Sequence, residues 1–172
     1  MEVSDETLKV IKTALEFSNQ SDDLFCISIL PLTKLWVFNA ENPTLPDPKD
    51  LSAAVGKSGS DKIKIRGNRI TLEKGSGIDL GAIAKGYIAD KIAELYKEQS
   101  LSGMIDLGGN ILTVGKKNNG KPFKIGVKKP FTESENLCTL EITEAAVSTC
   151  GVYERYFELD DKLYHHIINP RT

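Results

Sequence analysis

Two glycine-containing segments of this chain carry residue types that could hold a phosphate-bearing ligand. Residues 78–87 (IDLGAIAKGY) run from a predicted strand into a predicted helix. Gly81 would let the backbone approach a ligand closely, and free N–H groups at a helix start favour an anion. Lys85 falls in the predicted first turn, where the helix dipole disfavours a cation unless a phosphate lies nearby. The segment matches neither a Walker A nor a Rossmann fingerprint, and without further information such a turn is more often plain architecture.

The second segment, residues 106–110 (DLGGN), interrupts a predicted strand with a pair of glycines. The structural interpretation is a β-bulge, in which glycine relieves a local kink. The functional interpretation is that Gly108 and Gly109 allow a flat or phosphorylated ligand to lie against the backbone. Taken alone, the segment favours the bulge.

Both histidines of the chain, His165 and His166, are adjacent in residues 164–170 (YHHIINP). Adjacent residues on a strand point to opposite faces, so a two-histidine metal site is not expected. One histidine is predicted to face the core or a cleft, and the other to face water. A lone inward histidine is more often structural than catalytic.

The cysteines match no metal-binding spacing, and Cys26 and Cys138 are interpreted as small buried hydrophobic residues.

The elements that must position these segments can be predicted from periodicity and caps. Apolar residues at helical spacing predict helices at residues 4–19 and 82–99, and Asp50 is predicted to cap a short helix that ends at Val55. Alternation with period two predicts a hairpin that turns at Gly67 and Asn68. Pro31 is expected to limit regular structure, and residues 35–38 are predicted to form an aromatic anchor. Further strands are predicted at residues 104–107, 111–114, 123–127, 137–142, 145–148, 153–159 and 163–168, with a hairpin turn at residues 117–120.

Composition places the chain among ordinary globular proteins and excludes several classes. It has 172 residues, of which 40% are hydrophobic and 27% charged, and its net charge is −2. That charge argues against a general nucleic-acid binder, which shows a basic excess. No apolar run approaches the roughly 20 residues needed to span a bilayer, and residues 1–5 show no signal peptide. We therefore predict one α+β domain over residues 1–172, with a mainly antiparallel β-sheet packed with helices.

Taken together and in order, these segments resemble the ApbE family, the FAD:protein FMN transferases. Each matching segment alone is a weak signal, but several in the family's order and spacing are strong. The upstream residues 22–38 also resemble the family, so the resemblance covers nearly the whole chain. The matching motifs are residues 79–86 (DLGAIAKG), 105–110 (IDLGGN), 149–155 (TCGVYER) and 165–172 (HHIINPRT).

The resemblance implies a fold, a reaction and a location. It implies an ApbE-like (T-fold-like) domain that is incomplete at the termini. The family binds FAD with Mg²⁺, transfers the FMN half to a threonine or serine hydroxyl of a target protein, and releases AMP. Some members instead act as FAD pyrophosphatases that yield FMN and AMP. Family members are often membrane-anchored lipoproteins outside the cytoplasmic membrane, although no residue of this chain indicates a location.

The resemblance also implies roles for particular residues. Lys85 would offset phosphate charge, and the backbone carbonyl of Ala84 would be a metal ligand. His166 matches the family's inward histidine, a candidate for activating the acceptor hydroxyl. The residues expected to contact the flavin nucleotide are Asp79, Gly81, Ala84, Lys85, Gly108, Gly109, Asn110 and Thr149.

Some positions depart from the family pattern and support an alternative function. Cys26 and Val152 stand where the family has carboxylates, and Asn169 stands where it has aspartate. These changes favour a non-catalytic flavin-binding or partner-binding domain. A later family segment that supplies side-chain metal ligands is absent, and one carbonyl would hold Mg²⁺ poorly. We therefore expect this chain alone to be a poor enzyme, with open sheet edges that invite dimerisation.

Overall fold

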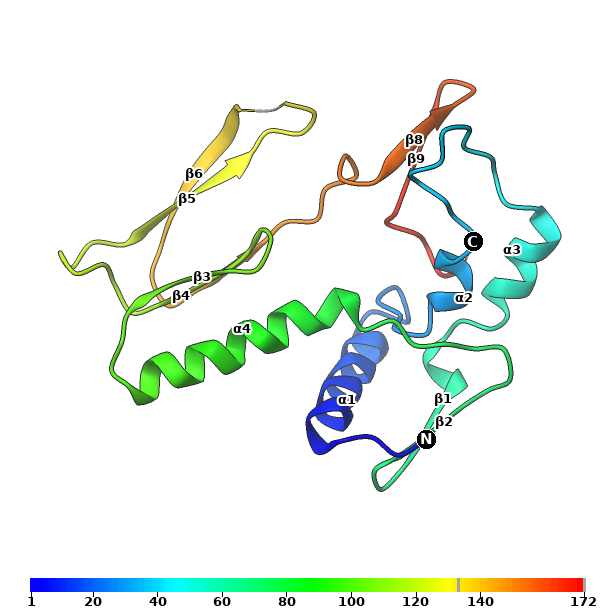
Figure 1. Ribbon diagram of the computed structural model, residues 1–172, viewed down its shortest axis with the longest axis horizontal. Coiled ribbons are helices and arrows are strands. Elements are labelled where there is room, and N and C mark those ends of the chain that lie inside the picture. Colours follow the sequence, from blue (N-terminus) through cyan, green and yellow to red (C-terminus); the bar gives the residue numbers. More distant parts are fainter. Residues whose placement is uncertain (133, 172) are drawn as a thin grey trace. The chain divides into compact units, whose positions relative to one another are not determined.

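The computed structural model describes residues 1–132 and 134–171, which form two compact units (Figure 1). Unit 1 combines Met1–Ile83 with the C-terminal residues from Glu154 onward, and unit 2 is Ala84–Tyr153. The described strands form small sheets whose pairs are all antiparallel, accompanied by helices, so the α+β prediction is confirmed. The prediction of one domain over residues 1–172 stays a prediction.

Unit 1 begins with helix α1 (Asp5–Gln20), as predicted from the sequence. Ser4 caps it, because its hydroxyl oxygen accepts a hydrogen bond of 3.2 Å from the Thr7 N–H. Asp5 and Glu6 lie in the first turn, where negative charge complements the helix dipole. A polar cap followed by one apolar face is therefore enough to specify this helix.

Two expectations about the short helices of unit 1 are wrong. Helix α2 (Leu30–Thr33) forms despite Pro31, because proline is tolerated in the first turn of a helix. Helix α3 (Pro48–Val55) is capped by Asp47 and not by Asp50. The Asp47 carboxylate accepts a 2.7 Å hydrogen bond from the Lys49 N–H. Proline is favoured at the first helical position, which places the start of α3 before the predicted one.

The 3₁₀ helix η1 (Ser60–Lys62) leads into the hairpin of β1 (Ile63–Arg66) and β2 (Arg69–Leu72). Arg66 pairs with Arg69, which confirms the predicted turn. Lys62 Nζ lies 3.0 Å from Asp61 Oδ2 and 3.3 Å from Glu73 Oε2. Hydrogen bonds to these carboxylates, first Asp61 and then Glu73, raise the pKa of the Lys62 ammonium above its ordinary value.

A second hairpin of unit 1 consists of β8 (Tyr156–Leu159) and β9 (Lys162–His165). The strand predicted to reach residue 168 therefore ends at His165. His166 continues the chain with a single backbone hydrogen bond of 3.0 Å, from its N–H to the Arg155 carbonyl. The two histidines do not share a strand, so the opposite-face argument does not apply to them.

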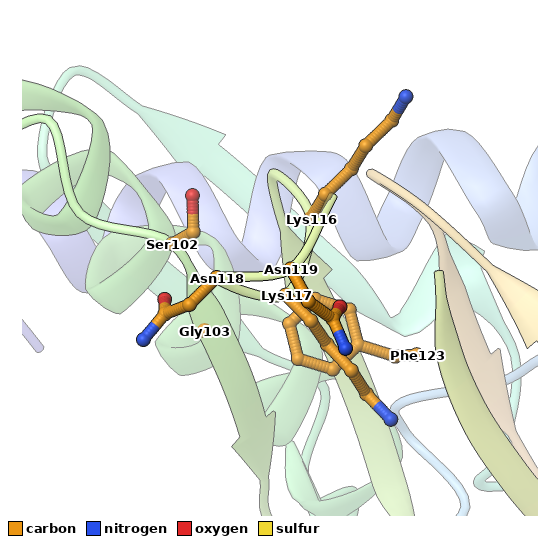
Figure 2. Close-up of a pocket in the computed structure, with 7 residues that line it drawn as sticks. All are labelled: Ser102, Gly103, Lys116, Lys117, Asn118, Asn119 and Phe123. Carbon is orange, nitrogen blue, oxygen red and sulfur yellow. The ribbon is translucent and has the colours of Figure 1, made fainter. Parts of the chain in front are cut away.

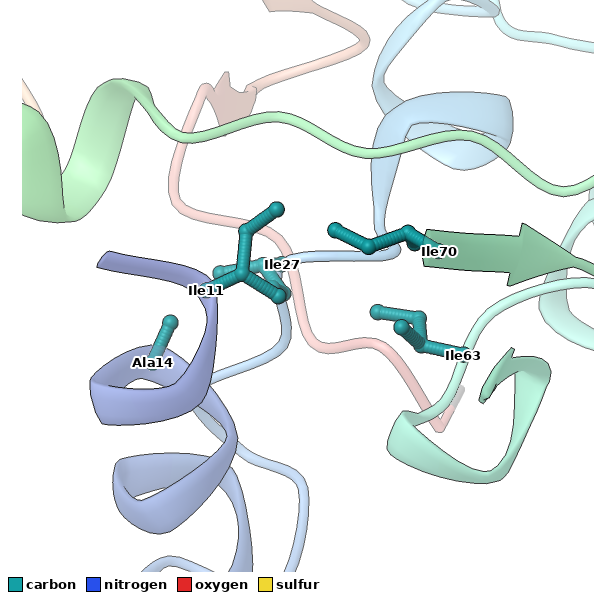
Figure 3. Close-up of a cluster of buried hydrophobic side chains, with 5 residues drawn as sticks. All are labelled: Ile11, Ala14, Ile27, Ile63 and Ile70. Carbon is teal, nitrogen blue, oxygen red and sulfur yellow. The ribbon is translucent and has the colours of Figure 1, made fainter. Parts of the chain in front are cut away.

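The core of unit 1 joins α1, the segment before α2 and the first hairpin. Its buried side chains point toward one another from these three elements (Figure 3). They are Ile11, Ala14, Ile27, Ile63 and Ile70.

The predicted aromatic anchor is confirmed as a separate cluster of unit 1. Trp36 stacks on Phe38 and on Tyr164 of β9, with ring centroids 6.0 Å apart in each pair. Phe157 of β8 stacks on Tyr164 at 5.3 Å.

Unit 2 contains most of helix α4 (Gly81–Glu98), which starts in unit 1 and matches the predicted helix within one residue. Strands β3 (Gly103–Asp106), β4 (Asn110–Val114) and β7 (Ala146–Ser148) form one sheet in the order β3-β4-β7. Strands β5 (Phe123–Lys128) and β6 (Asn136–Ile142) form a separate ribbon. The buried residues that join α4 to the sheet are Ala89, Ala93, Ile105 and Val114.

The glycine pair of unit 2 is a hairpin turn, so the predicted β-bulge is wrong. Strands β3 and β4 are antiparallel, with Asp106 opposite Ile111. Gly108 and Gly109 have φ angles of +63° and +85°, and the Leu107 N–H donates to the Asn110 carbonyl at 3.0 Å. Type I′ hairpin turns require positive φ at both central residues, which glycine adopts without strain.

Two other expectations for unit 2 also need correction. The turn at residues 117–120 exists, with a 2.8 Å hydrogen bond from the Gly120 N–H to the Lys117 carbonyl. However, the strands on either side of it pair with other strands. Cys26, in unit 1, is buried as predicted, but Cys138 is exposed, as are most residues of β6.

None of the helices in the described part of the chain combines the length and the apolar character that a membrane crossing requires.

Candidate functional site

The predicted site residues are divided between the two units. Asp79, Gly81 and His166 belong to unit 1. The others belong to unit 2, and they are Ala84, Lys85, Gly108, Gly109, Asn110 and Thr149.

In unit 1 the turn that contains Asp79 is attached directly to the core. The Asp79 backbone N–H donates a 2.7 Å hydrogen bond to the carbonyl of Ile27, whose side chain is buried. The Asp79 carboxylate accepts a 2.8 Å hydrogen bond from the Gly81 N–H at the start of α4. The Asp79 carboxylate therefore satisfies one of the N–H groups at the start of this helix.

Ser28 holds the segment that supports this turn, a role that sequence reasoning missed. Its hydroxyl donates to the Gly59 carbonyl at 2.7 Å and accepts from the Gly59 N–H at 2.6 Å. Ser28 is fully buried, and a buried hydroxyl that satisfies both groups of a distant residue fixes two loops together. A serine among apolar residues was the only sequence signal.

Cys26 contributes to packing in the same segment. Its Sγ lies 3.4 Å from the Ser28 Oγ, and the residue is buried. A carboxylate there would be costly without partners for its charge, and the thiol avoids that cost. Cys26 therefore acts as a core residue in unit 1.

Helix α4 positions Ala84 and Lys85. The sequence predicts Lys85 in the first turn of this helix. Because α4 starts at Gly81, Lys85 is instead its fifth residue and lies beyond the first turn. The first turn itself contains no acidic residue, and the Asp79 carboxylate just before it complements the positive end of the helix dipole. Ala84 lies within the helix, where its carbonyl is expected to accept the N–H of the residue four positions later. Only the remaining lone pair of that carbonyl could serve a metal.

In unit 2 the structure brings four predicted site residues together at one end of β4. Asp106 Oδ1 accepts a 2.9 Å hydrogen bond from the Gly109 N–H and thereby holds the turn. A side chain added to Gly108 would meet nothing within 4 Å, and at Gly109 the nearest atom would be Thr149 Oγ1 at 3.8 Å. Asn110 pairs with Ser148, whose hydroxyl donates to the Asn110 side chain. The glycine turn is thus an open backbone surface beside Thr149.

His166 has a hydrogen bond that defines its tautomer. Its Nδ1 lies 3.3 Å from the Arg155 carbonyl oxygen. A carbonyl can only accept, so in the neutral ring Nδ1 carries the proton and Nε2 is left as an acceptor. By contrast, Nδ1 of His165 is buried without a hydrogen-bond partner among the described residues. Of the two histidines, His166 is the one whose geometry suits a general base.

The described residues offer no preformed metal site. In residues 1–132 and 134–171, no group of three or more His, Cys, Asp or Glu is arranged to hold a metal ion. Thr172, the last residue of the motif that begins at His165, lies outside the described residues.

We expect Asp79→Ala to lower the free energy of unfolding of unit 1 by about 1 kcal/mol, the usual value of a lost helix-start hydrogen bond. Asp79→Asn should retain most of that stability, because the amide oxygen can still accept from the Gly81 N–H. Urea unfolding followed by the fluorescence of Trp36, the single tryptophan of the chain, measures both variants. Equal stability of the alanine variant and the parent would contradict a capping role.

Comparisons with known proteins agree with one another along the whole chain. The sequence model of the ApbE family matches residues 1–172. An FAD:protein FMN transferase of Klebsiella pneumoniae (strain 342) is 36% identical over 175 residues, which cover 99% of this chain and 54% of that protein. A protein of the same name from Vibrio cholerae is 32% identical over 177 residues, covering 99% of this chain and 52% of that protein. The chain therefore spans about half the length of the curated relatives it matches.

Solved structures show the same fold. The crystal structure of the ApbE protein from Thermotoga maritima superposes with a TM-score of 0.90 at 34% identity, covering 99% of this chain and 57% of that one. The apo form of the Pseudomonas stutzeri flavinyl transferase ApbE superposes with a TM-score of 0.83 at 27% identity, covering 99% and 54%.

Proposed function

Because this chain belongs to the ApbE family, we propose that it binds FAD and takes part in the transfer of FMN from FAD to a threonine or serine hydroxyl of a target protein, with release of AMP. The observation that carries this proposal is the open glycine turn beside Thr149, which is found within a chain similar to FMN transferases along 99% of its length. The flavin nucleotide and the target protein are the partners that the proposal requires.

The chemistry is a phosphoryl transfer in which atoms and charge balance. The acceptor hydroxyl oxygen attacks the phosphorus of the FMN half, the bond from that phosphorus to the bridging oxygen breaks, and AMP leaves with that oxygen. The hydroxyl proton must go to a base, and Nε2 of His166 is free to accept it. Lys85 would offset the charge of the phosphates. In such reactions positioning and electrostatic stabilisation provide most of the catalysis.

A magnesium ion is part of the reaction that the family resemblance implies, and the described residues do not fit it well. Mg²⁺ prefers about six oxygen ligands in octahedral geometry, carboxylates among them. The Ala84 carbonyl is the candidate ligand here, and the described residues contain no metal-binding cluster to join it. No step of the proposed transfer therefore depends on a metal held by these residues.

A second candidate function is flavin binding without turnover. It is favoured by one observation: Cys26, at a position where the family pattern has a carboxylate, is buried as a core residue. An FAD pyrophosphatase would differ from a transferase only in using water as the acceptor.

The decisive experiment measures AMP release from FAD and Mg²⁺, with and without a threonine-bearing acceptor protein. It is run on this chain and on the longest reading frame that contains it. We expect the longer protein to release AMP only with the acceptor, and this chain to quench flavin fluorescence while releasing little AMP. Release without any acceptor would indicate the pyrophosphatase.

The variant His166→Asn, made in the longer protein, separates FAD binding from AMP release in the same assay. We expect it to keep flavin quenching and to lose AMP release, because asparagine cannot take the hydroxyl proton. If the folded longer protein binds FAD and releases no AMP under any condition, the transferase proposal is wrong and the binding function stands. If it neither binds FAD nor releases AMP, both are wrong.

Dimerisation and location belong to the same proposal. In the described residues β5 and β6 pair only with each other, so each has an unpaired edge that could accept a strand from a second copy. We propose that this protein is located outside the cytoplasmic membrane, as members of its family often are.

A further inference from the structure

Unit 2 contains a cavity of about 390 Å³ that the proposed FMN transfer does not use. Ser102 and Gly103 line it at the start of β3, the turn residues 116–119 line it after β4, and Phe123 lines it at the start of β5 (Figure 2). We call it the basic pocket.

The basic pocket and the glycine turn lie at opposite ends of the β3–β4 hairpin. Gly103 pairs with Val114 at the pocket end, and Asp106 pairs with Ile111 at the other end. At about 3.3 Å per strand residue, three residues separate the two ends by roughly 10 Å. The pocket is therefore distinct from the glycine turn of the proposed flavin site.

The charge of the basic pocket is not balanced. It is lined by Lys116 and Lys117 and by no carboxylate, and neither lysine forms an ion pair with any described residue. Two other lysines of unit 2 do have partners: Lys124 lies 3.2 Å from Glu141, and Lys129 lies 2.7 Å from Glu135. Two adjacent lysines without ion-pair partners among the described residues therefore lie in the lining of the pocket, and no carboxylate of the lining offsets their charge.

One polar group beside the lysines is left as a donor. The Asn119 side-chain oxygen already accepts a 3.1 Å hydrogen bond from the Lys121 N–H, which leaves its amide N–H groups to donate. Lys117 Nζ lies 5.9 Å from the centroid of the Phe123 ring, a distance at which a ring attracts a cation. Figure 2 shows Lys117 and Asn119 on the side of that ring, while Lys116 extends away from it. The site can therefore take an anionic, hydrogen-bond-accepting group beside an apolar surface.

We propose that the basic pocket binds a carboxylate-bearing segment of a partner protein. The lining side chains are exposed apart from Phe123, which is half-buried, and such an open surface suits a docked chain better than an enclosed small molecule. A nucleic acid fits less well, because the chain carries a net charge of −2, and the pocket offers one aromatic ring and no arginine. The proposal does not require FMN transfer.

The test uses the whole chain and a fluorescein-labelled hexapeptide of alternating glycine and glutamate, with fluorescence anisotropy at low ionic strength. The variant Lys116→Gln/Lys117→Gln should bind this peptide roughly tenfold more weakly, because two charge pairs are lost. The matched control Lys124→Gln/Lys129→Gln removes the same charge from the same unit. It should retain most of the affinity, since those lysines lie outside the pocket.

Competing ligands decide between the possible anions. The same peptide with glutamine in place of glutamate should bind weakly, and inorganic phosphate and an oligothymidine should compete poorly. Circular dichroism checks that each variant is folded. Equal weakening by both double variants, tighter binding of the oligothymidine, effective competition by inorganic phosphate, or no preference for glutamate over glutamine would overturn the proposal. Because no step involves FAD, failure here leaves the proposed transferase untouched.

Discussion

Gly108→Val is expected to weaken FAD binding by about tenfold or more, equivalent to at least about 1.4 kcal/mol. Gly108 has a φ of +63°, and a side chain there would project into space that the protein leaves empty. If the flavin nucleotide lies against this turn, the isopropyl group occupies its place. Flavin fluorescence quenching on titration with FAD measures the effect.

The same substitution at Gly67 is the matched control for backbone strain. Gly67 has a φ of +59° and also has nothing within 4 Å of an added side chain, but it lies in the β1–β2 turn of unit 1. A residue forced into this region costs about 1–3 kcal/mol, so both variants should lose similar stability. Only the Gly108 variant should lose FAD affinity. If the two variants bind FAD equally well, the glycine turn is not part of the flavin site.

Ile27→Ala is expected to lower the free energy of unfolding of unit 1 by about 3 kcal/mol, from lost burial and the cavity left behind. Ile27 is 2% exposed and belongs to the core that joins α1 to the first hairpin. Because its carbonyl also accepts the Asp79 N–H, loosening this segment should disturb the turn that precedes α4. Chemical denaturation followed by Trp36 fluorescence reports on this unit.

Ile167→Ala makes the same chemical change at a site that is 42% exposed in the same unit. It should change the unfolding free energy by less than about 0.5 kcal/mol, as surface substitutions usually do. Comparable losses in the two variants would mean that the cluster around Ile27 does not form the core of unit 1.

Together, these contacts link the core of unit 1 to one part of its candidate site. Ser28 fixes the segment of Cys26 and Ile27 to Gly59, and Ile27 in turn holds Asp79. Stability and flavin binding should therefore change together for substitutions in this segment. In unit 2 the corresponding link is the hydrogen bond from Gly109 to Asp106, within the turn itself.

Local signals explain which features the sequence could predict. Helix α1, helix α4 and the β1–β2 turn depend on caps, periodicity and glycine within a few residues, and all three were predicted nearly to the residue. The order of the motifs was also enough to identify the family, since it depends on residue types and spacing alone. The same reasoning failed where two local solutions compete, as when a glycine pair could make a bulge or a tight turn.

Residue types and their spacing are therefore enough to predict the family, the α+β class and the main local elements. They do not predict that Thr149 lies beside Gly109, that Ser148 pairs with Asn110, or that a buried Ser28 holds Gly59. These contacts join residues that are far apart along the chain. Residues 148 and 110 are 38 positions apart, and residues 28 and 59 are 31 apart. Such pairs form only when whole strands and loops pack together, and no local sequence pattern identifies which residue the partner will be.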